Sequence, residues 1–262
     1  LGMKIRRASR KGAKVVVNDL GGARDGSGGG KAMADVVVDE IKKAGGTAVA
    51  NYDSVATVDG GKNIFKTAMD AFGQVDILVN NAGILRDKTF IKMTEAEWDA
   101  VIAVHLRGAF CVTQPIAIYL RERAKGGRII NTTSLSGLLG NFGQSNYGAA
   151  KAGIYGFTRV LSLEMQKYGV TVNAVAPVAK TRMTEDLPMF QGAPEEMDPK
   201  YITPIVLYLA SDLSQEVTGK IFGVQGRRVF SYRMVVSDGV EKPSGMWEAQ
   251  ELAKDIQKIL GE

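Results

Sequence analysis

Ser134, Tyr147 and Lys151 are of three types that together can exchange a proton with an alcohol. A phenol has an ordinary pKa near 10 and is a poor base at neutral pH, but a nearby ammonium favours the phenolate and lowers that pKa. The phenol can then take a proton from an alcohol or return one to a carbonyl oxygen, while a serine hydroxyl holds the same oxygen. Because these groups include no hydride acceptor, the chemistry implies a nicotinamide cofactor.

The elements around these residues are predicted to bring them together. The apolar run 128–133 is typical of a buried strand, with Ser134 at its carboxyl end. From Ser145 the apolar residues recur every three or four positions, which predicts a helix. Tyr147 and Lys151 are then one turn apart on one helix face. A Tyr-x-x-x-Lys pair occurs by chance in many helices, and Ser134 at a strand end is what favours the catalytic interpretation.

The same residues carry a resemblance to a known family. Ser134, Tyr147 and Lys151 resemble the catalytic residues of the short-chain dehydrogenase/reductase family. Its Asn-Asn-Ala-Gly motif is matched, after an apolar run, by Asn80, Asn81, Ala82 and Gly83. Segments 81–87, 104–108 and 140–144 further resemble the (3R)-hydroxyacyl-CoA dehydrogenase unit of type-two peroxisomal multifunctional enzymes and its stand-alone bacterial relatives.

The resemblance implies an oxidoreductase that transfers hydride between NAD(H) and a secondary alcohol or ketone, with a 3-hydroxyacyl-CoA or 3-oxoacyl thioester as substrate. Tyr147 would take the hydroxyl proton, Ser134 would orient the substrate oxygen, and Lys151 would lower the pKa of Tyr147 and bind the ribose. It also implies a homo-oligomer, a dimer or tetramer packed through helices 95–124 and 145–168. No metal ion is expected to take part.

Cofactor contacts are expected at the ends of the predicted strands. The strand 13–19 ends in Asp19, and an acid at this place accepts hydrogen bonds from the adenosine ribose and repels a 2′-phosphate, which favours NAD over NADP. A turn or helix-capping role for Asp19 is the alternative. The resemblance adds Asp53 and Val55 near the adenine, the motif from Asn80 to Gly83, and Thr181 beside the nicotinamide amide.

The start of the chain departs from the family pattern. A dinucleotide fold opens with a strand, a glycine turn and a helix that holds the pyrophosphate, and residues 1–12 contain no such turn. Either the sequence omits residues that carry it, or the protein is truncated and NAD binding is damaged. We favour the first, because losing a central strand should destabilise the sheet; an intact mass near 28.1 kDa would contradict it.

Glycines recur further on, in the segment 21–30, but the phosphate-loop pattern fails there. Asp25 stands where its first glycine should be, and Ala32 where its serine or threonine should be. We expect a flexible surface loop that could fold over the adenosine.

The alternation of strands and helices predicts an α/β fold, a Rossmann-like doubly wound parallel sheet in a single domain over residues 1–262. Helices are expected over 31–44, 59–72, 200–211 and 247–260, and strands over 47–51, 75–80, 170–175 and, as the last, 219–224. Residues 1–12 form an irregular or incomplete start, 225–246 are irregular, and 225–262 form a C-terminal extension. The segment 181–200 is expected to be a substrate lid or disordered.

A long helix is predicted to start with a capping box at Thr94, with Pro115 kinking or dividing it. His105, the only histidine, lies within it. It stands where most relatives place the asparagine of a proton relay, so its ring could hold a similar water. A helix histidine bonded to the backbone is an equally good interpretation.

Composition bounds these interpretations. The chain has 262 residues, 45% hydrophobic and 23% charged, which is typical of one soluble globular domain. No uninterrupted apolar run approaches the roughly 18 residues of a membrane span, and no secretory signal is visible. Cys111, the single cysteine, excludes an intrachain disulfide and is expected to be a buried inert thiol in a cytoplasmic protein.

The net charge of +5 comes from the first residues. Because the rest of the chain is balanced, a solvated end explains the charge better than a nucleic-acid surface does. The five basic residues are Lys4, Arg6, Arg7, Arg10 and Lys11.

Two other functions stay open. A hydroxysteroid or general alcohol dehydrogenase would use the same three catalytic residues. A non-catalytic binding subunit that has lost its glycine loop is the alternative from a different class.

Overall fold

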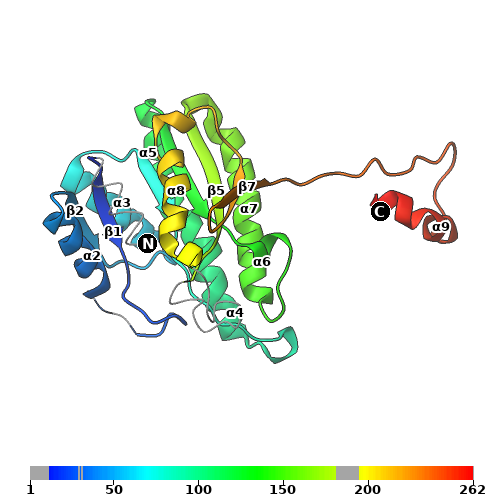
Figure 1. Cartoon of the computed structure of the whole chain (residues 1–262), viewed down its shortest axis with the longest axis horizontal. Helices are drawn as coiled ribbons and strands as arrows, with labels where there is room; N and C mark the ends of the chain where they lie inside the picture. The colour runs from blue at the N-terminus through cyan, green and yellow to red at the C-terminus, as the bar shows by residue number, and fades with distance from the viewer. Residues whose placement is uncertain (1–11, 29, 31, 181–194, 262) are drawn as a thin grey trace. The chain divides into compact units, whose positions relative to one another are not determined.

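The computed structural model describes residues 12–28, 30, 32–180 and 195–261 (Figure 1). The chain divides into two compact units, Leu1–Ser231 and Tyr232–Glu262. Thr181, the basic residues 4–11 and most of the expected lid lie outside the described residues.

Strands and helices alternate along the first unit, as predicted. The strands are β1 Lys14–Asn18, β2 Thr47–Asn51, β3 Ile77–Asn80, β4 Gly127–Thr132, β5 Val170–Val178, β6 Ile221–Gln225 and β7 Arg228–Tyr232. The helices are α2 Ala32–Lys43, α3 Val58–Phe72, α4 Glu95–Ile102, α5 Gly108–Arg123, α6 Leu135–Leu138, α7 Ser145–Met165, α8 Thr203–Leu209 and, in the second unit, α9 Ala249–Leu260. Single 3₁₀ turns are Phe90–Lys92, Gln166–Tyr168, Glu195–Met197, Pro199–Ile202 and Asp212–Ser214.

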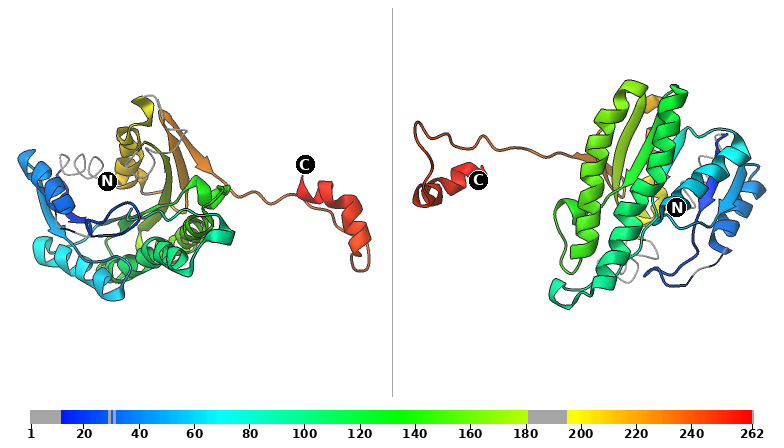
Figure 2. Two further views of the ribbon diagram at one scale, coloured as in Figure 1. Left: turned by 90° about the horizontal axis from the view of Figure 1, so that it is seen from below. Right: turned by 180° about the vertical axis from the view of Figure 1, so that it is seen from behind.

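The strands form two sheets. A two-stranded sheet has the order β1-β2, and a five-stranded sheet has the order β3-β4-β5-β6-β7. The pairs β1/β2, β3/β4, β4/β5 and β5/β6 are all parallel. Helices α5 and α7 run across one face of the larger sheet and α8 lies on the opposite face (Figures 1 and 2). This is the Rossmann-like doubly wound arrangement that the alternation predicted.

The centre of the larger sheet is buried on both faces. Ile129, Ile130 and Val172 of β4 and β5 are at most 1% exposed, which is usual for parallel strands covered by helices. Leu120 from α5 completes the core on one face, and Leu209 from α8 on the other. The rigid centre fixes where the carboxyl end of β4 lies.

Helices α3 and α5 approach each other through their backbones. A Cβ on Gly61 would lie 2.0 Å from the carbonyl oxygen of Cys111, so only glycine fits there. Cys111 is 2% exposed and has a free thiol, as the sequence predicted for its burial.

The long helical run is interrupted at a different place from the predicted one. Its start has the expected capping box between Thr94 and Glu97. The division falls at a π-helix, Ala103–Arg107, and α5 continues through Pro115 to Arg123. The prediction that Pro115 divides the helix was therefore wrong. Because a proline has no N–H, Pro115 leaves the carbonyl of Cys111 without its usual helical donor. That carbonyl lies at the contact with α3.

The run Glu95–Arg123 is long and apolar enough to cross a membrane by length and composition. In this fold its apolar residues Val101, Val112 and Ile116 are instead buried in the core, so it is a core helix that passes the same test.

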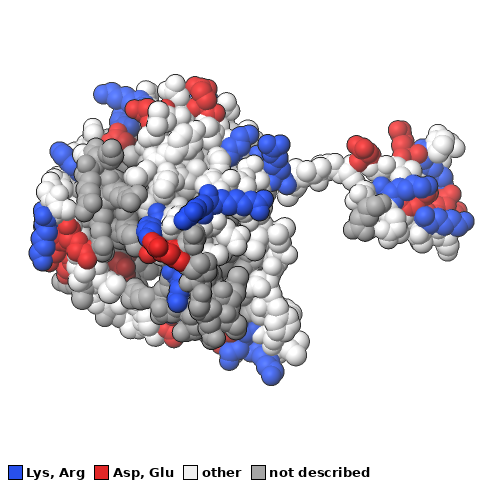
Figure 3. Space-filling view, in the orientation of Figure 1, with Lys and Arg blue, Asp and Glu red and all other residues white. Residues whose placement is uncertain are grey.

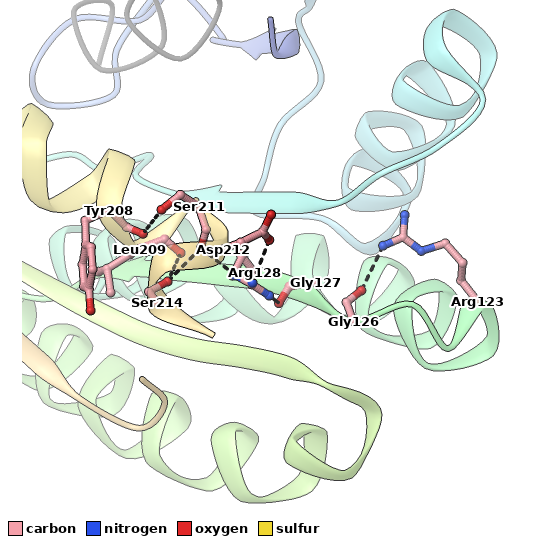
Figure 4. Close-up of polar contacts among 9 residues, drawn as sticks. All are labelled: Arg123, Gly126, Gly127, Arg128, Tyr208, Leu209, Ser211, Asp212 and Ser214. Atoms are coloured by element: carbon pink, nitrogen blue, oxygen red, sulfur yellow. Dashed lines mark hydrogen bonds and ion pairs between the residues drawn. The ribbon is translucent and has the colours of Figure 1, made fainter. Parts of the chain in front are cut away.

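The amino end of β4 is tied to the segment that follows α8 (Figure 4). The guanidinium of Arg128 donates to the carbonyl oxygens of Ser211 (3.2 Å) and Gly127 (3.0 Å) and to the carboxylate of Asp212 (3.2 Å). The hydroxyl of Ser214 donates to the carbonyl of Leu209 at 3.1 Å. These bonds fix α8 over β4 at the end of the sheet away from the catalytic residues.

Two predictions for the last third of the chain need correction. The strand predicted as the last, 219–224, is β6, and the segment expected to be irregular contains a further strand, β7. The helix expected over 200–211 is shorter, being a 3₁₀ turn followed by α8.

In the second unit, the ammonium of Lys242 donates a hydrogen bond to the carboxylate of Glu251 at 2.6 Å.

Charges of both signs are interspersed over the described part of the face in Figure 3.

Candidate active site

Ser134 lies two residues after the end of β4 and caps the short helix α6. Its backbone is extended, with φ −152° and ψ 154°, and its hydroxyl accepts a hydrogen bond from the Ser136 N–H at 3.2 Å. Capping of this kind holds the serine side chain at the carboxyl end of the sheet.

The first turn of α7 is fixed by a buried amide. Asn146 is fully buried, and its Nδ2 donates to the carbonyl oxygens of Arg86 (3.0 Å) and Glu97 (3.1 Å). Its Oδ1 accepts from the backbone N–H of Tyr147 at 2.7 Å. Tyr147 therefore starts from a backbone anchored to the loop after β3 and to α4.

The structure brings the three predicted catalytic residues together. Tyr147 is half-buried, and its interaction with the Ser134 side chain acts to lower the pKa of its phenol. The Nζ of Lys151 lies 5.5 Å from the centre of the Tyr147 ring. Proton exchange at the Tyr147 oxygen therefore has both the hydroxyl and the amine that the chemistry needs.

The pKa of Tyr147 is raised, whereas the sequence analysis expected it to be lowered. Burial raises the pKa of the Tyr147 phenol, the charge of Asp87 raises it further, and the hydrogen bond to Ser134 acts in the opposite direction. We expected Lys151 to lower this pKa. Because a buried phenolate loses its hydration, burial outweighs the neighbouring groups here.

Lys151 is buried with a single acceptor in the described structure. It is 4% exposed, and its Nζ donates to the carbonyl oxygen of Thr132 at 2.6 Å. Burial lowers the pKa of Lys151 to about 7. An ammonium has three N–H donors, so two remain for the hydroxyls of a ligand.

His105 lies in the π-helix beside Tyr147. The two rings meet edge-on, with centres 5.1 Å apart and an angle of 87°. The imidazole Nε2 lies 2.8 Å from the Ile84 carbonyl oxygen and 3.1 Å from the Ile84 nitrogen. A Cβ on Gly83 would lie 2.3 Å from the imidazole Cε1, so this glycine makes room for the ring.

The interpretation of His105 as a helix histidine bonded to the backbone is confirmed. Burial lowers the pKa of His105 to about 3; the charge of Lys151 adds to this, and the hydrogen bond to Ile84 opposes it. The imidazole is therefore neutral at physiological pH. Nδ1 is buried and has no hydrogen-bond partner among the described residues, so it remains open to a water.

A polar chain that the sequence did not reveal supports the site. The Nε2 of Gln144 donates to the carboxylate of Asp87 at 2.8 Å, and its Oε1 accepts from the Ser136 hydroxyl at 2.7 Å. Ser136 in turn lies 3.4 Å from the Ser134 hydroxyl. Gln144 and Asp87 fall in segments that carried the family resemblance, but spacing alone could not assign them a contact.

One cavity of about 500 Å³ reaches Lys151, the only one of the three predicted catalytic residues among its described lining residues. The predicted cofactor residues Val55, Asn81 and Ala82 line it, together with His105 and Lys151. Asn80 also lines it, but its amide is held by the Thr113 hydroxyl (2.8 Å) and the Asn131 side chain (2.9 Å), which gives Asn80 a role in joining β3 to α5 and β4.

The two acids predicted to meet the adenosine follow neighbouring strands. One carboxylate oxygen of Asp19 accepts from the Gly21 N–H at 2.8 Å, as the turn-capping alternative expects, and among the described residues no hydrogen bond to its second oxygen is seen, which a ligand could use. Asp53 accepts from the amides of Asn51 (2.8 Å) and Asn63 (2.9 Å). Carboxylates at these strand ends and the donors of Lys151 fit the two nucleoside ends of a nicotinamide dinucleotide.

Known proteins show the same combination of sequence and fold. Residues 6–191 match the family described as short chain dehydrogenase. The chain is 52% identical over 212 residues to the peroxisomal hydratase-dehydrogenase-epimerase of Saccharomyces cerevisiae, covering 81% of this chain but 23% of the yeast enzyme. It is 41% identical over 239 residues to the hydroxyacyl-CoA dehydrogenase ChsB1 of Mycobacterium tuberculosis, covering 84% and 72% of the two chains. A crystal structure of a short chain dehydrogenase from Mycobacterium avium superposes with a TM-score of 0.87 at 43% identity, over 99% of this chain and 90% of that one.

Proposed function

Since this chain belongs to the short-chain dehydrogenase/reductase family of NAD(P)-dependent enzymes, we propose that it oxidises 3-hydroxyacyl-CoA thioesters with NAD. The observation that carries the proposal is the amine of Lys151 5.5 Å from the centre of the Tyr147 ring, with the Ser134 side chain lowering the pKa of the same phenol. These residues give one substrate oxygen a proton acceptor and a positioning donor.

In the proposed mechanism the protein's side chains orient the substrate and transfer its proton, and they do not transfer the hydride. The Ser134 hydroxyl orients the substrate oxygen, and Tyr147 takes its proton during oxidation or returns one during reduction. When bound, the nicotinamide accepts or supplies the hydride. Because the pKa of Tyr147 is raised, its phenol is protonated in the free protein and is ready to act as the acid in ketone reduction. For oxidation, a protonated Lys151 attracts the phenolate that must form.

The preference for NAD rests on Asp19 at the end of β1. A carboxylate there accepts from ribose hydroxyls and repels a 2′-phosphate. Titration of the protein with NADH and NADPH tests this preference. Asp19→Ser should narrow the difference between the two dissociation constants, and an unchanged difference would remove Asp19 from this role.

The substrate class is supported by the relatives. ChsB1 is named a hydroxyacyl-CoA dehydrogenase, and the yeast enzyme, of which this chain spans about a quarter, is named for a dehydrogenase step. The segments 81–87 and 140–144, which suggested this subgroup, contain Asp87 and Gln144 of the polar chain behind Ser134.

The deciding experiment measures NADH formation with each member of a panel of substrates. The panel contains both enantiomers of a 3-hydroxyacyl-CoA, a hydroxysteroid and a simple secondary alcohol, with Tyr147→Phe as the inactive control. We expect turnover of one thioester enantiomer above all others. Turnover of the steroid alone would replace the proposed substrate, and the absence of heat on NAD titration would favour a non-catalytic binding subunit.

We also propose that the protein is a homo-oligomer. Apolar side chains on α5 and α7 are exposed: Phe110 by 44%, Ile118 by 46%, Val160 by 56% and Leu163 by 74%. Light scattering coupled to gel filtration should give a dimer or tetramer, and Leu163→Lys should shift it towards the monomer. A monomeric wild type would contradict the proposal.

A further inference from the structure

Gln144 is a buried amide that joins the active site to an exposed carboxylate. It is 8% exposed, and its Nε2 donates to the carboxylate of Asp87 at 2.8 Å. Its Oε1 accepts from the Ser136 hydroxyl at 2.7 Å and from the Asn141 Nδ2 at 2.9 Å. Because an ionised carboxylate can only accept hydrogen bonds, the charge of Asp87 fixes which end of the Gln144 amide faces Ser136.

The charge of Asp87 is not neutralised by an ion pair among the described residues. The two cations beside it in the sequence have other partners. The Lys88 ammonium lies 3.8 Å from the Glu97 carboxylate, and the Arg86 guanidinium donates to the carbonyl of Asp25 at 2.8 Å. The carboxylate of Asp87 therefore remains a charged acceptor for the Gln144 amide.

The orientation of this amide decides the direction of the hydrogen bonds that lead to Ser134. Because the Gln144 oxygen carries no proton, the Ser136 hydroxyl donates its one proton to that oxygen. The Ser136 oxygen is then left as an acceptor for the Ser134 hydroxyl, 3.4 Å away, and the Ser136 N–H donates to the Ser134 oxygen at 3.2 Å. The Ser134 oxygen is thus held in place, while its proton has only a bond longer than the usual O–H···O range of roughly 2.5–3.0 Å.

We propose that Gln144 and Asp87 are positioning residues for the Ser134 hydroxyl and act on it through Ser136. The proposal rests on the proposed oxidoreductase function, in which Ser134 orients the substrate oxygen. The long bond to Ser136 lets the Ser134 proton turn to that oxygen at little cost. A Ser136 hydroxyl facing the other way would occupy the second lone pair of the Ser134 oxygen, which the protonated Tyr147 phenol can otherwise use.

Tyr147 responds to both ends of this chain of hydrogen bonds. Burial is the largest influence and raises the pKa of the Tyr147 phenol; the Ser134 side chain acts to lower it, and the charge of Asp87 raises it. The other titratable groups beside Tyr147 in the described structure are His105 from the π-helix and Lys151 from α7. Two substitutions within the chain should therefore shift the titration of Tyr147 in opposite directions.

The titration of Tyr147 tests the positioning role without turnover. The full chain is labelled with carbon-13 at the tyrosine Cζ and followed by NMR, and the Tyr147 signal is the one that disappears in Tyr147→Phe. In Asp87→Asn the midpoint should fall by roughly half a pH unit, because asparagine keeps an acceptor for the Gln144 amide but loses the charge. In Gln144→Leu the midpoint should rise, because Ser134 loses its orientation while Asp87 keeps its charge.

A merely structural role predicts a different result. A loosened site would hydrate the Tyr147 ring and lower its pKa in both variants. Shifts of the same sign, or no shift in either variant, would therefore overturn the proposal. If Gln144→Leu does not fold, Ser136→Ala breaks the same link and should raise the midpoint in its place. Because this measurement needs neither cofactor nor substrate, it decides the proposal even if the substrate panel shows no turnover.

An exchange of donor and acceptor tests the same chain in the active enzyme. Gln144→Glu places two carboxylates against each other and should lower kcat by about tenfold. Adding Asp87→Asn restores one donor between the two positions, so kcat should return to within about threefold of the wild type. Gln215→Glu, at an exposed glutamine after the turn Asp212–Ser214, is the matched control and should retain full turnover. A double variant as slow as Gln144→Glu alone would overturn the proposal.

Discussion

Strand β4 has a cation at each end, and the two are held in opposite ways. At the amino end, Arg128 donates to the Gly127 and Ser211 carbonyls and to the Asp212 carboxylate (Figure 4). At the carboxyl end, Lys151 donates to the Thr132 carbonyl and, in the described structure, has no carboxylate beside it.

The comparison shows that the energetically unfavourable burial of a charged group occurs at the carboxyl end of β4. A buried ammonium without a counter-charge is unfavourable, and burial accordingly lowers the pKa of Lys151 to about 7. Such perturbed groups are typical of sites that do chemistry. The amino end of β4 stabilises the fold, and the carboxyl end keeps polar atoms of Lys151 and His105 available.

The largest effect is expected for Tyr147→Phe. Removing the hydroxyl removes the proton acceptor, and general acid–base catalysis contributes about 10²- to 10⁴-fold. We expect kcat to fall by that factor with Tm nearly unchanged, measured with the best substrate of the panel. Tyr155→Phe, on the same helix two turns on, is the matched control and should retain full turnover. A Tyr147→Phe enzyme with wild-type kcat would remove this residue from catalysis.

Lys151→Met should stabilise the protein while abolishing turnover. The folded-state pKa of about 7 lies below the ordinary value of 10.5, so between these pH values the unfolded chain binds the proton and the folded one does not. The stability of the wild type must then rise with pH across that window. Denaturant unfolding should show Lys151→Met more stable, on the order of a few kcal/mol below pH 7, with the difference closing towards pH 10.5. A difference independent of pH would show that Lys151 titrates normally.

Much of this arrangement could be predicted from the sequence, because it depends on local spacing. The i, i+4 relation of Tyr147 and Lys151 and the strand end at Ser134 predicted that these three residues lie near one another, as they do in the structure; their catalytic role stays a prediction. The strand prediction for 47–51 matches β2, and the capping box at Thr94 is present.

What could not be predicted depends on contacts distant in the sequence. The π-helix at His105 forms where the ring packs against Gly83 and Tyr147, which no periodicity reports. The strand β7 is short and largely exposed, so it shows no buried apolar run to detect. The raised pKa of Tyr147 follows from burial, which residue spacing does not give.

The buried imidazole of His105, at the carboxyl end of the sheet, should make the stability of the protein depend on pH in the acid range. Its folded-state pKa of about 3 lies below the ordinary 6.5, so the unfolded chain binds the extra proton between these values. Wild-type stability is therefore lost as pH falls through that window, by about 1–2 kcal/mol at pH 5. His105→Gln, which does not titrate, should lack this part of the loss in unfolding measured at pH 8 and pH 5. Parallel pH profiles of the two proteins would contradict the neutral buried imidazole.

The smallest effects belong to the amino end. Arg128→Met keeps the apolar stem and removes the donors to the Gly127 and Ser211 carbonyls, of which the second still accepts from the Ser214 hydroxyl at 3.1 Å. We therefore expect about 1 kcal/mol of destabilisation. Asp212→Ala should cost less, because the Asp212 carboxylate is fully exposed and exposed ion pairs contribute about 0–1 kcal/mol. Both variants should retain wild-type kcat, since the substitutions lie at the opposite end of β4 from Tyr147. A loss of turnover in Arg128→Met at unchanged stability would mean that the two ends of the strand are coupled, and the division between a stabilising end and a reactive end would fail.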